Sequence, residues 1–187
     1  MRVRDEPRRE GARADAIAAR AAAAGDWPAA VTALRARGWA EREVFDYAAA
    51  RATLNRAIAV ARRRGLTDLR AGVHATRASV WLEVGNARRA RADIALARAA
   101  LDGRSTPEID LQEAVIEDAS GHLILAAGLY RRMLEADRPP PAAETRFTVH
   151  NNLGVVLMQL GELEEARLQL THAARHAADL GRSTEGS

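Results

Sequence analysis

Two series of small residues recur along the chain at the same intervals, and they constrain the fold more than any other feature. In both series the successive intervals are 40, 36 and 40 residues. The first series consists of Gly38, Ala78, Ala114 and Gly154, and the second of Ala50, Ala90, Ala126 and Ala166. Self-similarity at a fixed period of this size is the sequence signature of a helical repeat array.

A large residue follows each alanine of the second series four positions later. These residues are Leu54, Ile94, Tyr130 and Leu170. Small residues stand where two antiparallel helices cross, and large residues fill the holes beside them. We therefore expect helix hairpins in which Ala126 and Ala166 are buried at the crossings. Each hairpin alone leaves an apolar face bare, so neighbouring hairpins must stack.

The composition agrees with an all-α chain and excludes several functions. Hydrophobic residues make up 48% of the sequence and aromatic residues only 4%, and much of the apolar share is alanine, the best helix former. No apolar stretch is long enough for a membrane span, and the N-terminus lacks the core of a signal peptide. Without cysteine there is no disulfide, thiol nucleophile or thiolate metal site. We expect a cytoplasmic protein.

All 28 basic residues are arginine, a usage typical of a bacterial genome of high GC content such as that of an actinobacterium. Residues 1–104 hold 21 arginines against 12 acidic residues, whereas residues 105–187 hold 7 against 13. The two parts of the sequence therefore carry opposite net charge.

The markers predict one leading helix and four hairpins in an α-α superhelix over residues 9–180, with disordered ends at 1–8 and 181–187. The hairpins are expected at about 28–64, 67–101, 107–137 and 141–180. The helices are expected at 9–24, 28–44, 46–64, 67–84, 87–101, 107–119, 122–137, 141–160 and 163–180. Pro28 and Pro107 suit first-turn positions, and Pro139–Pro141 must interrupt the chain. The surplus over the usual period of about 34 residues is expected in extended helix ends or inter-repeat loops.

The third hairpin departs from the apolar pattern. Asp110, Glu113 and Glu117 stand where large apolar residues are usual. We expect this hairpin to pack loosely.

The segment from His150 to Leu157, with Leu153-Gly154 at its centre, resembles the tetratricopeptide (TPR) repeat. It is followed by Leu160-Gly161-Glu162-Leu163, then Ala166 and Leu170, as in that family. The phrases Arg37-Gly38-Trp39-Ala40-Glu41-Arg42, Asp46-Tyr47-Ala48-Ala49-Ala50-Arg51 and Asn152-Leu153-Gly154 are similar to TPR regions that precede CHAT peptidase domains in actinobacteria. The His–Cys pair of that peptidase is absent, because this sequence has no cysteine.

The resemblance implies a concave groove lined by the first helix of each hairpin. Carried onto this sequence, the groove positions are Arg35, Trp39, Arg42, Thr76, Ser79, Glu83, Gln112, Asp118, Asn151, Asn152 and Gln159. Only Asn152 stands at a position like those that clamp a C-terminal carboxylate in some TPR domains, so we do not expect that mode. Trp39 between Arg35 and Arg42 is either a binding anchor or a packing residue against the preceding helix.

Other candidate sites have plainer interpretations. His172 and His176 lie one helical turn apart and could share a metal ion, but a surface pair is the preferred interpretation and no metal or cofactor is expected. His74 and His150 occupy aromatic positions of their repeats and are expected to pack. The arginines at 62–64 and at 88, 89 and 91 are expected to be solvated rather than to bind nucleic acid.

No catalytic motif is present, so the sequence predicts no enzyme and no catalytic residue. It favours a protein-interaction or sensor module that binds a peptide or partner domain in its groove, and the resemblance implies regulation of a CHAT-type effector. The alternative is the TPR part of a transcriptional or signalling regulator that binds a small peptide or effector ligand. The last helix is expected to expose an apolar strip that could support self-association, formed by Leu163, Ala166, Leu168, Leu170, Ala173, Ala174, Ala177 and Leu180.

Overall fold

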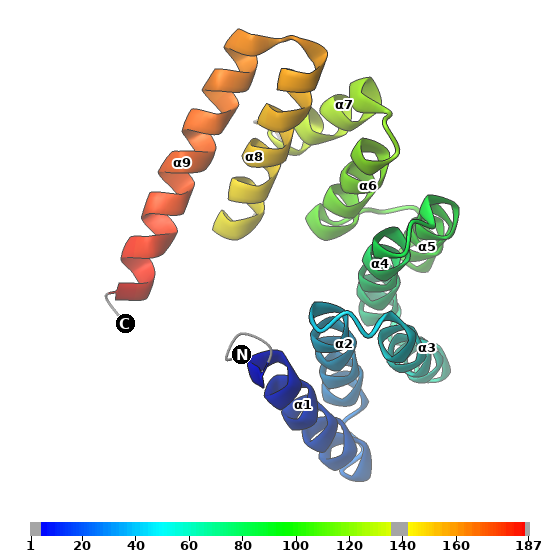
Figure 1. Cartoon of the computed structure of the whole chain (residues 1–187). Helices are drawn as coiled ribbons and strands as arrows, with labels where there is room; N and C mark the ends of the chain where they lie inside the picture. The colour runs from blue at the N-terminus through cyan, green and yellow to red at the C-terminus, as the bar shows by residue number, and fades with distance from the viewer. Residues whose placement is uncertain (1–4, 136–141, 186–187) are drawn as a thin grey trace. The chain divides into compact units, whose positions relative to one another are not determined.

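The computed structural model describes residues 5–135 and 142–185, with their side chains over 9–135 and 142–179. The described residues form nine α-helices and no strand (Figure 1). The helices are α1 (Asp5–Ala23), α2 (Trp27–Glu43), α3 (Tyr47–Arg63), α4 (Thr67–Glu83), α5 (Ala87–Ala100), α6 (Pro107–Ala119), α7 (Leu123–Met133), α8 (Ala143–Leu160) and α9 (Leu163–Glu185). Each expected helix is present, and no described helix is long and apolar enough to cross a membrane.

The chain divides into two compact units, where the sequence predicted one continuous array. Unit 1 is Met1–Ser105 and holds α1 to α5; unit 2 is Thr106–Ser187 and holds α6 to α9. The segment between α5 and α6 contains Asp102 and Gly103, both with positive φ. This division follows the charge boundary of the sequence, so unit 1 is basic and unit 2 is acidic.

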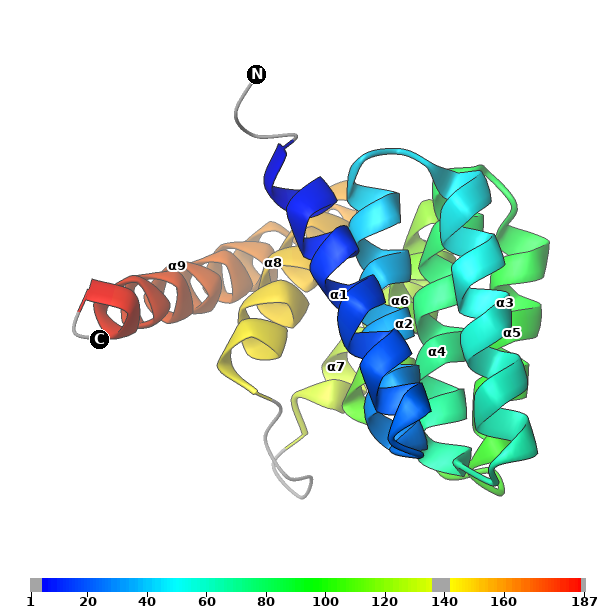
Figure 2. The same ribbon diagram turned by 90° about the horizontal axis from the view of Figure 1, so that it is seen from below.

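In unit 1, α2 lies between α1 and α3, and it also contacts α4 (Figures 1 and 2). α4 pairs with α5 as the second hairpin. The interior is built largely from alanine with a few aliphatic side chains, which are Val31, Leu34, Leu54, Val73 and Val80. The small alanines allow these helices to pack closely.

The turns of unit 1 repeat one local structure every 20 residues. Gly25, Phe45, Gly65 and Gly85 each adopt positive φ after the last helical turn. The amide of the residue after it donates back to a carbonyl of the last helical turns and so caps the C-terminus of the helix. The amide of Asp46, for example, donates to the carbonyl of Glu41 at 2.9 Å. Asp46 then caps α3 by accepting from the amide of Ala49 at 3.0 Å. Because α2, α3 and α4 are 17 residues long and these turns are equally short, the surplus length lies in the helices.

The small-and-large register predicted from the sequence is confirmed. Ala126 is 0% exposed and Ala166 is 1% exposed. A Cβ atom added to Gly38 would lie 2.6 Å from Cγ of Leu54, and one added to Gly154 would lie 2.7 Å from Cγ of Leu170. The first and fourth hairpins therefore need glycine, not merely a small residue, at their crossings.

In unit 2, α8 pairs with α9 and also packs against α6 and α7. Its core is mainly aliphatic, with Val149, Leu153, Val156 and Leu157 fully buried together with Tyr130. The expectation of a loosely packed third hairpin is wrong for its centre. Ile109 and Ile116 supply the buried apolar face of α6, and buried Glu117 is paired with His122, whose Nδ1 lies 2.6 Å from its Oε2.

Several helix ends differ from the prediction. α1 begins at Asp5 instead of residue 9, and acidic residues and Pro7 suit a first helical turn. α9 continues to Glu185 instead of 180, because one glycine costs only about 1 kcal/mol in a helix and no proline follows. α7 ends at Met133, before the predicted residue 137. The predicted break at Pro139–Pro141 lies outside the described residues.

The predicted apolar strip of α9 is exposed in part. Ala166 and Ala173 are buried, and Leu170 packs at Gly154 of α8. Leu163, Ala174 and Ala177 are exposed on one side of the helix, whereas exposed Leu168 projects from another side. The side chain of Leu180 lies outside the described side chains.

Candidate functional site

A groove of about 780 Å³ lies among α1, α2 and α4 of unit 1. These helices are neighbours in Figure 2. Residues that line the groove include Arg13, Ile17, Thr32, Arg35, Trp39 and Thr76. Three of the residues expected from the sequence, Arg35, Trp39 and Thr76, are thus brought together from two helices. We call this surface the α2 groove.

Arg35 is held across the α2 groove by a specific contact. Its Nε donates to Oγ1 of Thr76 at 2.7 Å, and the Thr76 hydroxyl donates to the carbonyl of Gly72 at 3.0 Å. Burial lowers the pKa of Arg35, but an arginine titrates so far above neutrality that it stays cationic. The groove therefore presents a positioned, partly desolvated positive charge.

Trp39 presents nearly half of its side chain at the groove, being 48% exposed. The guanidinium of Arg42 lies 3.8 Å from the centre of its ring, and Nη2 of Arg42 donates to Glu43 at 2.7 Å. Such a stacked cation contributes about 0.5–1 kcal/mol at an exposed site. Arg42 thus supports the ring from outside the groove lining, and the ring keeps a large apolar surface accessible.

The other two expected residues of unit 1 do not line this groove. Ser79 is buried, and its hydroxyl donates to the carbonyl of Thr76 at 2.7 Å within the same helix. Glu83 is exposed at the end of α4. A buried, hydrogen-bonded serine has no surface to offer a partner, so Ser79 stabilises α4 instead.

The expected residues of unit 2 lie on α6 and α8. Gln112, Asp118, Asn151 and Asn152 are partly buried, and Gln159 is exposed. Asn152 donates to the hydroxyl of Tyr130 at a long 3.4 Å, and burial raises the pKa of Tyr130 to about 12. Burial also raises the pKa of Asp118. These contacts are internal to unit 2 and do not create a positioned charge comparable to Arg35.

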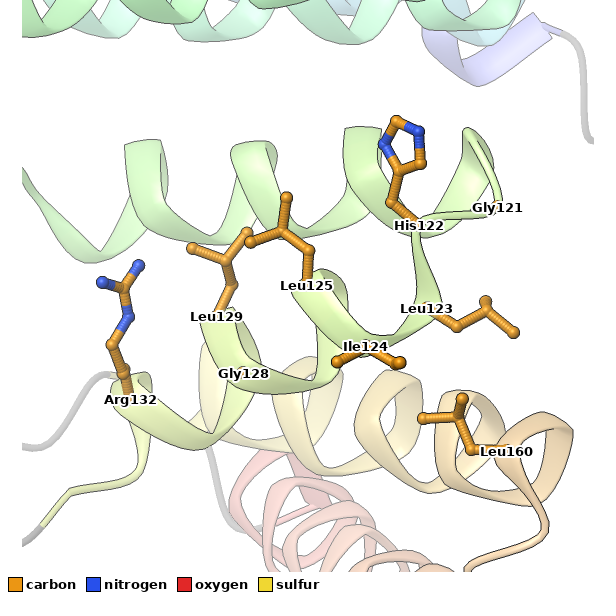
Figure 3. A pocket seen from close by; sticks show the side chains of 9 residues that line it. All are labelled: Gly121, His122, Leu123, Ile124, Leu125, Gly128, Leu129, Arg132 and Leu160. Atoms are coloured by element: carbon orange, nitrogen blue, oxygen red, sulfur yellow. The ribbon is translucent and has the colours of Figure 1, made fainter.

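An apolar groove of about 970 Å³ on unit 2 was not predicted (Figure 3). It is formed along α7 and reaches Leu160 at the end of α8, and we call it the α7 groove. The sequence did hold a signal. Leu123, Ile124 and Leu125 follow one another, and three successive residues of a helix cannot all face the same core.

The tryptophans of unit 1 each lie against arginine, which accounts for part of the basic runs. Arg64 lies 3.9 Å from the ring centre of Trp27, and Arg89 lies 4.5 Å from that of Trp81. These arginines cover aromatic rings of their own unit. Arg64 and Trp27 are far apart in the sequence, and Arg89 and Trp81 lie on consecutive helices, so neither contact follows from the spacing within one helix.

His74 and His150 pack against neighbouring side chains, as predicted from the sequence, whereas the side chain of His122 is more than half exposed. Nδ1 of His74 lies 2.8 Å from Oδ1 of buried Asp93. The ring centre of His150 lies 5.1 Å from that of His172 and 5.4 Å from that of His176. Burial, and then the neighbouring positive groups, lower the pKa of His150. Among the described residues, no group of three His, Cys, Asp or Glu side chains is arranged to hold a metal ion.

Asp93 forms the centre of a charged cluster in unit 1. Nε of Arg77 donates to its Oδ2 at 2.8 Å, and Nη1 of Arg77 donates to Asn55. Burial raises the pKa of Asp93, but hydrogen bonds from His74 and Arg77 outweigh it, so the net pKa is lowered. Because Asp93 is only 2% exposed, this cluster stabilises the hairpin and does not face a substrate.

The comparisons with known proteins found similar structures but no match to the sequence. No protein-family model matches the sequence, and no curated protein matches it. Among solved structures, BtubC (BKLC) from P. vanneervenii is similar at a TM-score of 0.63 and 16% identity, over 83% of this chain and 66% of that one. The present chain thus spans slightly less than two thirds of BtubC.

Two further structures are similar over nearly their whole length. MamA from Desulfovibrio magneticus RS-1 has a TM-score of 0.57 and 13% identity, over 91% of this chain and 96% of that one. A Podospora anserina protein of the kinesin light chain type, with nearly identical TPR-like repeats, has a TM-score of 0.57 and 15% identity, over 96% and 95%. At these identities the likeness shows the fold: an all-α, TPR-like α-α superhelix.

Proposed function

We propose that this chain is a non-enzymatic protein-interaction module whose α2 groove binds a peptide or an extended segment of a partner. The observation that carries the proposal is Trp39, which is 48% exposed beside the fixed charge of Arg35. Tryptophan and arginine dominate the energetics of protein interfaces, especially where they meet in a concave surface. The fold of stacked hairpins creates extended concave surfaces of this kind.

The chemistry of the α2 groove selects the kind of segment that it binds. The exposed ring of Trp39 and the side chain of Ile17 favour an apolar or aromatic anchor. The charged residues of the lining are Arg35, Arg13 and Glu10, so its net charge is positive and favours an acidic group on the bound segment. A groove of about 780 Å³ also suits a small ligand, which supports the alternative of a regulator that senses an effector molecule.

The cellular setting is part of the same proposal. We infer an actinobacterial protein that regulates a CHAT-type effector, from the all-arginine basic residues and the resemblance of the repeat phrases, and a cytoplasmic location from the lack of cysteine. Copurification of such an effector with the protein expressed in its source organism would support this setting. Copurification with DNA-binding or small-molecule-sensing components would favour the regulator instead.

Selection of peptides from a displayed random library tests the groove directly. We expect the selected peptides to lose at least tenfold in affinity for the Trp39→Ala variant and for the Arg35→Ala variant, with helicity unchanged. Leu96→Ala is the matched control, because Leu96 on α5 is 49% exposed and lines neither described groove. Selected peptides that bind Trp39→Ala and Arg35→Ala as well as they bind the unmodified chain would remove the α2 groove as the site.

A further inference from the structure

The α7 groove is an unusually apolar surface for an exposed helix. Ile124 is 80% exposed, and Leu125 is also exposed, while Leu129 and Leu160 form the floor and one end (Figure 3). Single exposed apolar residues are ordinary, but a contiguous group around a groove marks an interaction site.

Gly128 lies in the middle of this groove, and the fold of unit 2 does not require it. A Cβ atom built there would meet no atom within 4 Å, whereas Gly38 and Gly154 are enforced by close leucines. A glycine inside a helix costs about 1 kcal/mol relative to alanine. Its effect here is to leave the backbone of α7 open to the groove, so that a side chain from outside can approach it closely.

A cation stands at one end of the groove. Figure 3 shows Arg132 at the end opposite His122 and Leu160. Arg131 is tied to Glu162 and Glu165 at 2.6 and 2.7 Å, but no ion pair connects exposed Arg132 to another side chain among residues 9–135 and 142–179. An acidic group on a partner would complement this charge even though unit 2 as a whole is acidic.

We propose that the α7 groove binds an amphipathic α-helix of a partner protein, with an acidic residue of that helix paired with Arg132. A large apolar side chain of the partner packs over Gly128, between Ile124 and Arg132 (Figure 3). Small residues let two helices approach closely, and a helix bound in a groove is anchored by residues spaced three or four positions apart. This surface lies in unit 2 and is additional to the α2 groove.

Two synthetic peptides test the proposal on the full chain at about 150 mM salt, where long-range charge effects are screened. Both are 18-residue amphipathic helices with the same leucine stripe, one flanked by glutamate and the other by lysine. We expect the glutamate peptide to bind at least tenfold more tightly, and Arg132→Glu to reverse this preference. Arg175→Glu, an equal charge change at an exposed position of α9, leaves the preference intact.

A second variant tests the space over Gly128. Gly128→Gln fills the groove without adding apolar surface, so binding of the glutamate peptide falls at least tenfold while the unfolding midpoint stays equal or rises. Ala95→Gln on α5 is the matched control and retains binding, as does Trp39→Ala in the other groove.

Three results overturn the proposal. The first is failure of both peptides to bind at millimolar concentration, and the second is equal effects of Arg132→Glu and Arg175→Glu. The third is self-association of the unmodified chain, seen by light scattering, that Gly128→Gln abolishes. That last result would make a second copy of this chain the occupant.

Discussion

Units 1 and 2 use the same register of small and large residues but fill the space around it differently. Both second and fourth hairpins place a histidine 19 residues before its hydrogen-bonding partner: His74 with Asp93 in unit 1, and His150 with Gln169 in unit 2. In unit 1 the partner is a buried carboxylate, also held by Arg77. In unit 2 the partner is an amide, and the surrounding core is aliphatic.

The same repeat pattern is therefore stabilised by different interactions in the two units. Unit 1 combines an alanine-rich interior with a charged cluster, and its arginines cover its tryptophans. Unit 2 has a mainly aliphatic core in which side chains of α7 and α8 predominate. The two units also offer different surfaces, a charged α2 groove with an exposed tryptophan and an apolar α7 groove.

The largest expected difference between the units is at the partners of the two histidines. Asp93→Ala leaves Arg77 and His74 without their buried carboxylate and should destabilise unit 1 by about 3–5 kcal/mol. Gln169→Ala removes one neutral hydrogen bond and should cost unit 2 only about 0.5–1.5 kcal/mol. Native-state hydrogen exchange of α4 and α8 amides measures each unit separately. Equal losses of stability in Asp93→Ala and Gln169→Ala would mean that the charged cluster around Asp93 stabilises unit 1 no more than one neutral hydrogen bond stabilises unit 2.

The crossing glycines should give the next largest effect. Gly154→Ala forces a methyl group against Leu170 and to within 3.3 Å of the carbonyl of Ala166, so it should cost about 1–3 kcal/mol. Gly38→Ala meets only the side chain of Leu54 and should cost less. Gly128→Ala is the control and should gain up to about 1 kcal/mol. Chemical unfolding curves give all three values, and a neutral Gly154→Ala would contradict the packing at that crossing.

Sequence spacing was sufficient to predict these crossings, because the small-and-large register depends on residues that recur at fixed intervals. The same periodicity predicted most ends of the described helices to within about four residues. It did not predict the positive φ of Phe45, since the other turns of this kind carry glycine.

The candidate site was harder to predict from the sequence than the helices were. Arg35 and Trp39 were found from the resemblance, but their joining with Thr76, and the burial of Ser79, depend on the angle between α2 and α4. The α7 groove and the arginine–tryptophan contacts were missed for the same reason. The division into two units was also missed, although the charge boundary at residues 104–105 coincides with it.

Mild acid should destabilise unit 2 more than unit 1. The pKa of His150 is lowered from 6.5, so its contribution is fully present above that value, and unit 2 loses stability as pH falls from about 6.5 through the folded value. The pKa of Asp93 is lowered from 3.8, so unit 1 loses the corresponding contribution only below about pH 3.8.

Hydrogen exchange of α8 and α4 between pH 7 and 5 measures this difference. We expect α8 to lose protection in that range beyond the intrinsic pH effect, while α4 does not. His150→Gln should remove the loss. An unchanged pH response in that variant would assign the effect to other groups.

The smallest expected effect is a gain at Phe45. This residue is 62% exposed and holds a φ of 64°, which is unfavourable for any residue with a Cβ atom. Phe45→Gly should stabilise unit 1 by about 0.5–1 kcal/mol, the relief of strain being offset by the freedom of glycine in the unfolded chain. Phe45→Ala keeps the strain and is the control, so a larger gain for alanine would rule out this explanation.

Hydrogen exchange of the full chain, with and without a peptide selected by its binding, shows directly whether the α2 groove is the binding site. We expect slower exchange in α1, α2 and α4 around the α2 groove, strongest near Arg35 and Trp39, and lost in the Trp39→Ala variant. Slower exchange confined to α6 to α9, or no slowing in unit 1 with the peptide bound, would contradict the assignment of the α2 groove as the binding site.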